Sequence, residues 1–395
     1  MSMSKIKIAD FAEVITGGTP STSNPEYWEN GDVPWLQSGA CQNDVITGCD
    51  TFITQKGLEN SAAKMMKPDS VLIALTGATT GKVGYLTFEA CANQSVTGIQ
   101  PNERFVSKYL YYYLRGIRQK ILDDSYGGAQ KHISQGYVKN IEVPLGSIEE
   151  QKTITKLLES VDTTIALRQQ ELQLLDDLIK ARFVEMFGEP IANPMGWPVK
   201  RLKDLSVLIT NGNTPKGGSE NYVESGITFL RSQNVWRNRI ELDDVAFIDE
   251  ATHESMKKSS LRHDDILITK TGRINTENSS LGRAALFKGP DNSANINGHV
   301  YLVRLDGSIV PEFVVTILTG EAYRKYIRKV CVGGIDKRQI NVDQVEDFPI
   351  IIPPYEQQKA FAAFVALVDK SKVVVQKALD EAQLLFDSLM QQYFG

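Results

Sequence analysis

Apolar side chains recur at alternating steps of four and three residues along two long stretches of the chain, 149–188 and 356–395. The first stretch contains no proline and no internal glycine, so it can form one uninterrupted helix. This heptad spacing predicts a helix that packs its apolar seam against a partner helix. At about 1.5 Å per residue the helix would be roughly 58 Å long, which is more than one compact domain requires. The seam consists of Ile154, Leu158, Val161, Ile165, Arg168, Leu172, Leu175, Ile179, Arg182 and Met186.

The second stretch repeats the first at a constant offset of 207 residues, so the chain itself can supply the partner helix. The offset pairs Gln151-Lys152 with Gln358-Lys359, Val161-Asp162 with Val368-Asp369, and Phe187-Gly188 with Phe394-Gly395. A pseudo-two-fold axis between the two halves would make the helices antiparallel, and we expect such an intramolecular coiled coil. The second seam consists of Phe361, Val365, Val368, Lys372, Val375, Leu379, Ala382, Phe386, Leu389 and Tyr393.

The repeat extends into the regions that precede the two helices. The run Ile15-Thr16-x-Gly18 returns as Ile209-Thr210-x-Gly212, and residues 71–77 and 127–132 return at 266–272 and 333–338. By contrast, residues 43–64 bear no likeness to residues 238–258. These patterns predict an α+β fold in which two similar globular bodies share a framework, carry different surfaces and are separated by the helix pair. We expect body one at 1–147, the first long helix at 148–189, body two at 190–353 and the second long helix at 354–395.

The net charge of −5 lies in the helical segments, because the two bodies together are neutral. Residues 1–148 contain 13 Lys and Arg against 14 Asp and Glu, and residues 197–353 contain 21 against 20. A neutral body can still present a local basic face, so the overall charge does not exclude nucleic-acid binding.

Composition predicts a cytoplasmic protein without membrane contact. Of the 395 residues 42% are hydrophobic and 23% are charged. No apolar run approaches the roughly 18 residues of a membrane helix, and the N-terminus lacks the apolar core of a secretory signal. The four cysteines, Cys41, Cys49, Cys91 and Cys331, lack the paired spacing of zinc or thiol-redox sites, so we expect them to be reduced packing residues.

Motifs of catalysis are incomplete. Residues 74–83 resemble a phosphate-binding P-loop, but only three residues separate Gly77 from Gly81 where four are required, and Val83 replaces the hydroxyl that would bind Mg²⁺. Ile352 stands before Pro-Pro-Tyr where adenine methyltransferases have Asn or Asp to bind the target amino group. There is no carboxylate cluster typical of a nuclease, and the four histidines are scattered. We therefore predict a binding protein with no catalytic residue, no metal site and no cofactor of its own.

Basic, amide and hydroxyl side chains cluster in corresponding loops of the two bodies. Arg and Lys suit guanine, Asn and Gln suit adenine, and glycine-flanked loops allow the backbone to approach DNA closely. The paired recurrence makes these residues candidates for DNA binding. They are Gln37, Ser38, Thr76, Thr79, Lys82, Asn93, Gln94, Gln130, Lys131 and His132 in body one, and Arg231, Gln233, Asn234, Lys270, Arg273, Asn297, His299, Lys337 and Arg338 in body two.

Two body helices also carry basic stripes that could follow a phosphate backbone. The stripes are Arg115, Arg118 and Lys120 in body one, and Arg324, Lys325, Arg328 and Lys329 in body two. The tyrosines beside the first stripe, Tyr109 and Tyr111 to Tyr113, occupy both faces of their helix, and we interpret most of these rings as core.

Each of the two glycine-punctuated bodies is followed by a long helix, which begins near Ile-Glu-Glu-Gln-Lys (148–152) in the first half and near Pro-Pro-Tyr-Glu-Gln-Gln-Lys (353–359) in the second. In this arrangement the chain resembles the specificity subunits of type I restriction-modification systems over nearly its full length. The first helix departs slightly from the usual form, with Pro144-Leu-Gly-Ser where the second has Pro353-Pro354.

The resemblance implies that each body is a target recognition domain that reads one half of a split sequence in double-stranded DNA. It implies that the helices set the spacing between the half-sites and dock modification (methyltransferase) subunits, two of them, and that restriction subunits join through the complex. S-adenosylmethionine, ATP and Mg²⁺ would belong to those partner subunits.

Two alternatives remain open from the sequence. In the first, the chain is a cytosolic scaffold whose bodies bind proteins on a coiled-coil rod, which the neutral charge of both bodies permits. In the second, the chain is a stand-alone methyltransferase fusion, which the incomplete motifs disfavour.

Overall fold

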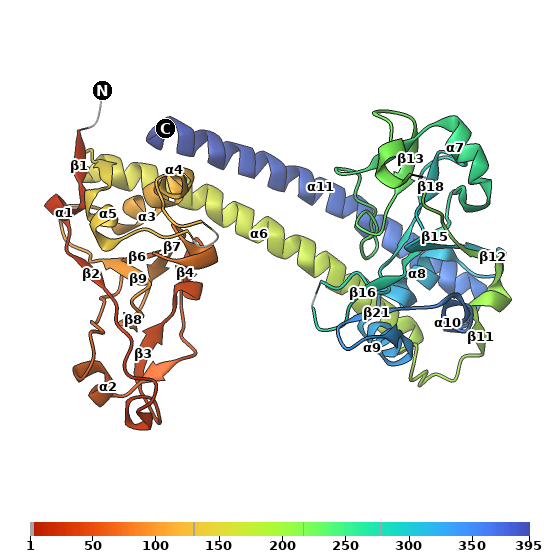
Figure 1. The fold of residues 1–395 in the computed structure, drawn as a ribbon, viewed down its shortest axis with the longest axis horizontal. Helices are drawn as coiled ribbons and strands as arrows, with labels where there is room; N and C mark the ends of the chain where they lie inside the picture. The colour runs from red at the N-terminus through yellow and green to blue at the C-terminus, as the bar shows by residue number, and fades with distance from the viewer. Residues whose placement is uncertain (1–3, 129–130, 216, 277) are drawn as a thin grey trace. The chain divides into compact units, whose positions relative to one another are not determined.

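The computed structural model describes residues 4–128, 131–215, 217–276 and 278–395. The chain divides into two compact units, one formed by residues up to Gln169 together with Gln376–Gly395, and the other by Gln170–Val375. Each unit holds one globular body and part of each of two long helices, α6 (Ile148–Phe187) and α11 (Tyr355–Phe394) (Figure 1). The two long helices predicted from the heptad pattern are therefore present.

Body one contains a five-stranded sheet in the order β2-β9-β6-β7-β4 and a three-stranded sheet in the order β5-β3-β8. In the larger sheet, β6 lies between antiparallel β9 and β7 and all four of its residues are buried, which explains why its sequence is apolar throughout. The elements are β1 (Lys5–Lys7), α1 (Ile8–Phe11), β2 (Val14–Thr16), β3 (Val33–Leu36), β4 (Asp44–Ile46), β5 (Phe52–Ile53), α2 (Gln55–Glu59), β6 (Val71–Ala74), β7 (Val83–Leu86), β8 (Cys91–Ala92), β9 (Val96–Ile99), α3 (Ser107–Gly116), α4 (Arg118–Asp123), α5 (Gln135–Asn140) and β10 (Glu142–Pro144).

Body two repeats this plan with a four-stranded sheet in the order β12-β19-β15-β17 and a three-stranded sheet in the order β14-β13-β18. It adds a small sheet in the order β16-β21-β20. The elements are β11 (Val199–Arg201), β12 (Ser206–Asn211), β13 (Ile227–Leu230), β14 (Ala246–Ile248), α7 (Glu250–Ser255), β15 (Ile266–Thr269), β16 (Thr271–Arg273), β17 (Ala284–Leu286), β18 (Ala294–Ile296), β19 (Val300–Leu305), α8 (Pro311–Thr319), α9 (Glu321–Val330), β20 (Val332–Gly333), β21 (Lys337–Gln339), α10 (Val342–Glu346) and β22 (Pro349–Ile351).

The two bodies diverge at one edge of the larger sheet. Asn43 and Asn238 both have a left-handed backbone, with φ of 64° and 59°. Their N–H groups donate to the carbonyl oxygens of Val83 and Ala284 at 2.7 and 2.9 Å. After this shared turn, body one forms β4, which pairs in parallel with β7. Within the described part of body two, no strand takes the corresponding place beside β17. The dissimilar segments 43–64 and 238–258 thus differ in structure as well as in sequence.

A close backbone approach corrects the predicted glycine alignment by one residue. Gly17 N donates to Val96 O at 3.0 Å, and Gly212 N donates to Val300 O at 3.1 Å, at equivalent places in the two bodies. A Cβ atom would lie 2.1 Å from a carbonyl oxygen at Gly17 and 1.9 Å from one at Gly212. Both positions therefore require glycine, and Gly212 corresponds to Gly17 instead of Gly18.

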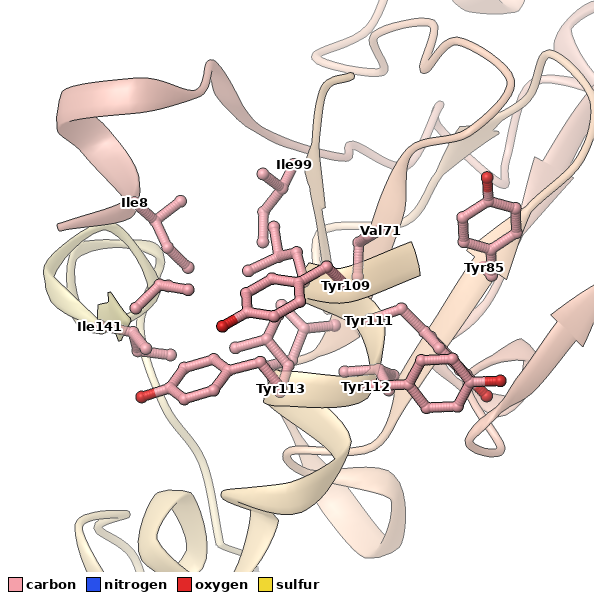
Figure 2. Close-up of a cluster of buried hydrophobic side chains, with 14 of the residues drawn as sticks. Ile8, Val71, Tyr85, Ile99, Tyr109, Tyr111, Tyr112, Tyr113 and Ile141 are labelled. Atoms are coloured by element: carbon pink, nitrogen blue, oxygen red, sulfur yellow. The ribbon is translucent and has the colours of Figure 1, made fainter. Parts of the chain in front are cut away.

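The tyrosines of α3 are core residues, as predicted (Figure 2). The hydroxyl groups of Tyr109 and Tyr113 donate to the carbonyls of Pro144 and Glu142 at 2.5 and 2.6 Å, which ties α3 to β10. Tyr111 donates to Asn43 O at 2.5 Å. Burial raises the pKa of Tyr109 and Tyr111 to about 12, so both hydroxyls remain protonated donors at neutral pH.

Arg115, predicted to follow a phosphate backbone, instead holds body one against the long helices of its own unit. Its guanidinium donates to both carboxylate oxygens of Asp162 on α6, at 3.0 and 3.1 Å. It also lies 4.9 Å from the ring centre of Phe386 on α11. The prediction for Arg115 is wrong because the spacing of basic residues along a helix does not distinguish an exposed arginine from one whose aliphatic stem is buried and whose charge is neutralised by a carboxylate.

A buried glutamine fixes the start of each long helix to its body. Gln151 accepts a bond from Val106 N at 2.9 Å and donates to Gly146 O at 3.0 Å. Gln358 does the same with Val310 N at 3.0 Å and Pro353 O at 2.8 Å. Both side chains are 1% exposed. We call each arrangement a glutamine clamp. The clamp accounts for the repeated glutamine of the Gln-Lys motif. Gly146 and Pro353, which differ in sequence, provide the same carbonyl acceptor before the two helices.

In the unit that contains body two, α6 and α11 run in opposite directions. Phe187 packs on Phe361 with ring centres 5.7 Å apart, and Asp176 forms an ion pair with Lys372 at 2.5 Å. Residue numbers thus fall along α6 as they rise along α11. Lys372, the polar residue of the second seam, is neutralised by a carboxylate of the partner helix.

Both long helices also expose apolar side chains that no other part of the described chain covers. On α6, Leu167 and Leu174 are each 59% exposed. On α11, Val373 and Leu384 are 69% and 72% exposed. Among the described residues, none of the helices is both long and apolar enough to cross a membrane.

Removal of a clamp should destabilise the protein. We expect Gln358→Ala to lower the free energy of unfolding by about 1–3 kcal/mol, because it leaves a buried N–H and a buried C=O without partners. Gln358→Glu should also destabilise, since a carboxylate cannot donate to Pro353. Chemical denaturation monitored by circular dichroism measures the change. The adjacent, exposed Gln357→Ala is the control and should have little effect; equal effects of the two alanine variants would contradict the role of the clamp.

Candidate nucleic-acid interface

Backbone hydrogen bonds bring the candidate loops of body one together. Asn93 N donates to Leu36 O at 2.8 Å, which joins the loop after β8 to the loop after β3. Leu75 N donates to Ser95 O at 2.8 Å and Ile133 N donates to Leu75 O at 2.9 Å, which add the loops after β6 and before α5. Four loops that are distant in the sequence thus meet at one end of the two sheets.

The same bonds recur in body two with other side chains. Asn297 N donates to Leu230 O at 3.0 Å, Lys270 N to His299 O at 2.8 Å, and Ile340 N to Lys270 O at 2.9 Å. We call this arrangement the four-loop network. Body two extends it, because β16 pairs with β21 and β21 pairs with β20. In body one, the corresponding contacts are isolated bridges from His132 to Thr76 and to Tyr126.

The structure places the body one candidates in and around this network. Gln37, Gln94 and Lys131 are exposed, whereas Ser38, Thr76, Thr79, Lys82, Asn93 and His132 are half-buried. Lys82 Nζ donates to Gln42 Oε1 at 2.6 Å and Lys131 Nζ donates to Leu122 O at 3.0 Å. His132 lies against Tyr126, with ring centres 3.8 Å apart. Gln130 falls outside the described residues.

In body two, Arg231, Gln233 and Asn234 form one hydrogen-bonded group with Asp244. Arg231 Nη2 donates to Asp244 Oδ1 at 3.1 Å and Gln233 Nε2 donates to Asp244 Oδ2 at 2.5 Å. Asn234 is 2% exposed, and its amide bonds the backbone of Arg231, Glu241 and Asp244 at 2.9–3.0 Å. Asn234 therefore shapes the loop, and Arg231 and Gln233 are the side chains that the loop presents.

The remaining candidates of body two lie on the small β16-β21-β20 sheet and the loop beside it. Arg273, His299 and Lys337 are exposed, and Lys270, Asn297 and Arg338 are half-buried. Arg273 Nε lies 3.3 Å from Asp336 Oδ2, and Arg338 Nε donates to Gly334 O at 3.2 Å. The paired backbone of this sheet brings Arg273 directly opposite Lys337 and Gly272 opposite Arg338.

A second basic group in body two lies outside the candidates predicted from the sequence. Arg283 stacks on the ring of Trp236 at 3.7 Å, and Arg239 lies 5.2 Å from the centre of the same ring. Burial, together with the neighbouring charge of Arg237, lowers the pKa of Arg283. The two arginines at 237 and 239 form a basic run that could have been recognised in the sequence, but nothing in the sequence links this run to Arg283. No sequence pattern predicts a role for Asp244.

The described residues contain no group of His, Cys, Asp and Glu that could hold a metal ion. Four cysteines are free thiols, and burial raises the pKa of Cys41 and of Cys91 to about 12. These thiols are protonated and unreactive at neutral pH. What the bodies present is a set of hydrogen-bonding and basic side chains on a rigid backbone network.

Comparison with known proteins agrees with this architecture. The MjaIX specificity subunit of a type I restriction enzyme from Methanocaldococcus jannaschii is 26% identical, with 97% of this chain and 90% of the relative covered. The StySPI specificity subunit from Salmonella potsdam is 24% identical over 93% of this chain and 83% of the relative. A crystal structure of the type I restriction-modification S subunit from M. genitalium has a TM-score of 0.59 at 14% identity, covering 100% of this chain and 96% of the other.

A second solved structure, of a type I restriction-modification system, has a TM-score of 0.56 at 17% identity and covers 100% of this chain and 97% of the other. At these identities the two structures establish a shared fold. The family model described as the type I restriction modification DNA specificity domain matches residues 2–176 and again residues 194–382. With both halves of the chain matched, the protein belongs to the family of type I restriction-modification specificity subunits.

Proposed function

We propose that the chain is the DNA-recognition subunit of a type I restriction-modification complex, in which each body reads one half of a bipartite target. The observation that carries this proposal is the four-loop network. It is the same in both bodies, and it holds different polar and basic side chains in each. A backbone network that both bodies share, with different side chains on each, suits a protein that reads two different short sequences in the same way.

The side chains of the network have the chemistry that direct reading requires. Arg and Lys can bond guanine, and Gln and Asn can bond adenine, in the major groove. Lys131 and Arg338 occupy equivalent places in the two bodies, because Lys131 O accepts from Gly77 N and Arg338 pairs with Gly272. Cations at these places can contact phosphates and so position the neighbouring side chains over base edges.

The long helices would act as the spacer and as the docking surface for partners. We infer an antiparallel coiled coil about a pseudo-two-fold axis, which would relate residues 1–147 with helix 148–189 to residues 190–353 with helix 354–395. The opposed directions of α6 and α11 in the unit of body two support it. Exposed leucines on both helices offer apolar surface to modification subunits, for which we propose a number of two.

Catalysis would reside in the partner subunits. Methylation would use S-adenosylmethionine, and restriction would use ATP and Mg²⁺, all bound outside this chain. The incomplete P-loop and the isoleucine before Pro-Pro-Tyr support this division of labour.

A binding selection tests the proposal. The chain, assembled with its modification subunits, is incubated with a pool of randomised duplexes, and the retained DNA is sequenced. We expect enrichment of two short sequences separated by a gap of fixed length. Retention without any enriched sequence, or no retention at all, would instead favour a protein-binding scaffold.

The combined substitution Lys337→Ala and Arg338→Ala should weaken reading of the second half-site. We expect the affinity for the selected duplex to fall about tenfold or more, from the loss of contacts worth about 1–3 kcal/mol. Affinity for duplexes that lack the second half-site should barely change in a gel-shift assay. The control is Lys257→Ala with Lys258→Ala, an exposed basic pair of body two that lies outside the candidate loops. An equal loss on unrelated duplexes would reduce Lys337 and Arg338 to nonspecific phosphate contacts.

Lengthening the helices should change the gap. One heptad inserted after Gln169 and one after Val375 lengthen both helices by about 10 Å. We expect the selected gap to grow by about three base pairs, since one DNA turn of about 34 Å spans about ten base pairs. Insertion into α6 alone is the control and should disrupt pairing of the seams. An unchanged gap after the double insertion would contradict the spacer role.

Asp244→Asn should make binding less dependent on sequence. The substitution removes the negative charge beside Arg231 but keeps the shape of the side chain and the bond from Arg231 Nη2 to Asp244 O at 2.6 Å, so Arg231 stays in place with a charge that can attract a phosphate. We expect nonspecific affinity to rise and the slope of log K against log salt to steepen by about one. Asp243→Asn makes the same charge change at an exposed neighbour and serves as the control. Identical salt slopes for both variants would show that Asp244 acts only through overall charge.

A further inference from the structure

Ile335 is exposed at the tip of a basic hairpin in body two. The hairpin consists of β20 and β21 with the turn between them, residues 332–339. Ile335 is 90% exposed, the most exposed of the large apolar side chains among the described residues. Val332 at the base of the turn is 40% exposed. The polypeptide thus presents an aliphatic side chain to water at a place where burial would ordinarily stabilise the fold.

Ile335 is exposed on an ordered backbone, because backbone hydrogen bonds hold the hairpin on both of its edges. Val332 and Gly333 pair with Gln339 and Arg338 across the hairpin. On the other edge, β21 pairs with β16, and Ile274 N donates to Asp336 O at 3.0 Å, next to Ile335 itself. The backbone that presents the side chain is therefore held in place before any partner binds, so binding would order little further backbone.

The surroundings of Ile335 are cationic. Lys337 and Arg338 follow it on the same hairpin, and Arg273 pairs with Lys337 on the adjacent strand. Among the described residues, the carboxylate beside the tip, Asp336, faces Arg273 at 3.3 Å, which leaves the charge of Lys337 without an acidic partner. A rigid aliphatic tip framed by cations complements DNA, whose phosphates are anionic and whose thymine bases carry a methyl group.

We propose that Ile335 contacts the C5-methyl group of a thymine in the second half-site, from the major groove. The inference rests on the proposed function and adds one specificity-determining residue to it. A two-stranded ribbon fits the major groove, and apolar contact with the thymine methyl is one of the few ways in which an aliphatic side chain can distinguish base pairs. Body one has Ala129 at the aligned position of its sequence, so the contact belongs to the second half-site alone.

Deoxyuridine substitution tests the contact, because uracil lacks only the methyl group. The complex with modification subunits is used, and the second half-site is defined by the selection described above. Each thymine of that half-site, on either strand, is replaced singly by deoxyuridine. We expect one replacement to weaken binding of the unaltered protein about threefold to fivefold, the effect of one buried methyl-sized group.

The substitution Ile335→Ala, combined with the deoxyuridine duplexes, completes a double-mutant cycle between protein and DNA. It should lose a similar factor on the thymine duplex and should no longer distinguish thymine from deoxyuridine at that position, whereas Ile335→Val should retain most of the discrimination. Val207→Ala, which truncates another exposed aliphatic residue of body two, is the control and should bind like the unaltered protein; Val207 is 65% exposed.

Three results would overturn the inference. In the first, no thymine of the second half-site is sensitive to deoxyuridine, or the half-site contains no thymine. In the second, Ile335→Ala binds less tightly but remains as sensitive as the unaltered protein, which would indicate a wedge between base steps instead of a methyl contact. In the third, Ile335→Ala leaves DNA binding intact but impairs assembly, which would assign the tip to a protein partner. Failure of the selection to yield a bipartite sequence would instead count against the proposed function.

Discussion

The architecture depends on two buried glutamine side chains. Gln151 and Gln358 each join the first turn of a 40-residue helix to the start of a helix in the adjoining body. An amide supplies a donor and an acceptor together, and the clamp uses both. Because the side chain is buried, an unmade bond would not be replaced by one to water, so the helix leaves its body in a defined direction. The proposed spacer role of the helices would require this direction to be fixed.

The sequence predicted the framework better than the site. Heptad spacing and the internal repeat located both long helices, because a long run of apolar periodicity has few alternative structures. The glycine at 212 was misaligned by one residue, because sequence similarity does not reveal which backbone atoms approach each other. The predicted phosphate contact of Arg115 is wrong, because its carboxylate partner Asp162 is 47 residues away in the sequence. A tertiary contact of that kind leaves no local pattern.

The candidate site was predicted as a set of loops, but its internal organisation was not. The four-loop network consists of backbone hydrogen bonds. These bonds depend on the backbone conformation and not on the side chains, so the residue types in the loops do not predict them. Within the loops, Asn234 is a predicted base contact because of its amide group, but its side chain is buried and hydrogen-bonds the backbone of its own loop. Asp244 bonds both Arg231 and Gln233, but as an acidic residue it does not fit the pattern of basic and amide side chains from which the candidates were predicted. The placement of base contacts remains a prediction.

The edge strand β4 has a consequence for how such proteins diversify. It is attached to its sheet along one side only, by its pairing with β7, and the residues that form it follow the turn at Asn43 that both bodies share. A segment at a sheet edge can change in length or composition with little effect on the strands behind it. Substitutions in this segment should therefore destabilise the fold little. After a duplication, the two copies could diverge in this segment while the contacts between each body and its long helix stay the same. Divergence would accumulate at the rim of the sheet and leave the reading framework intact.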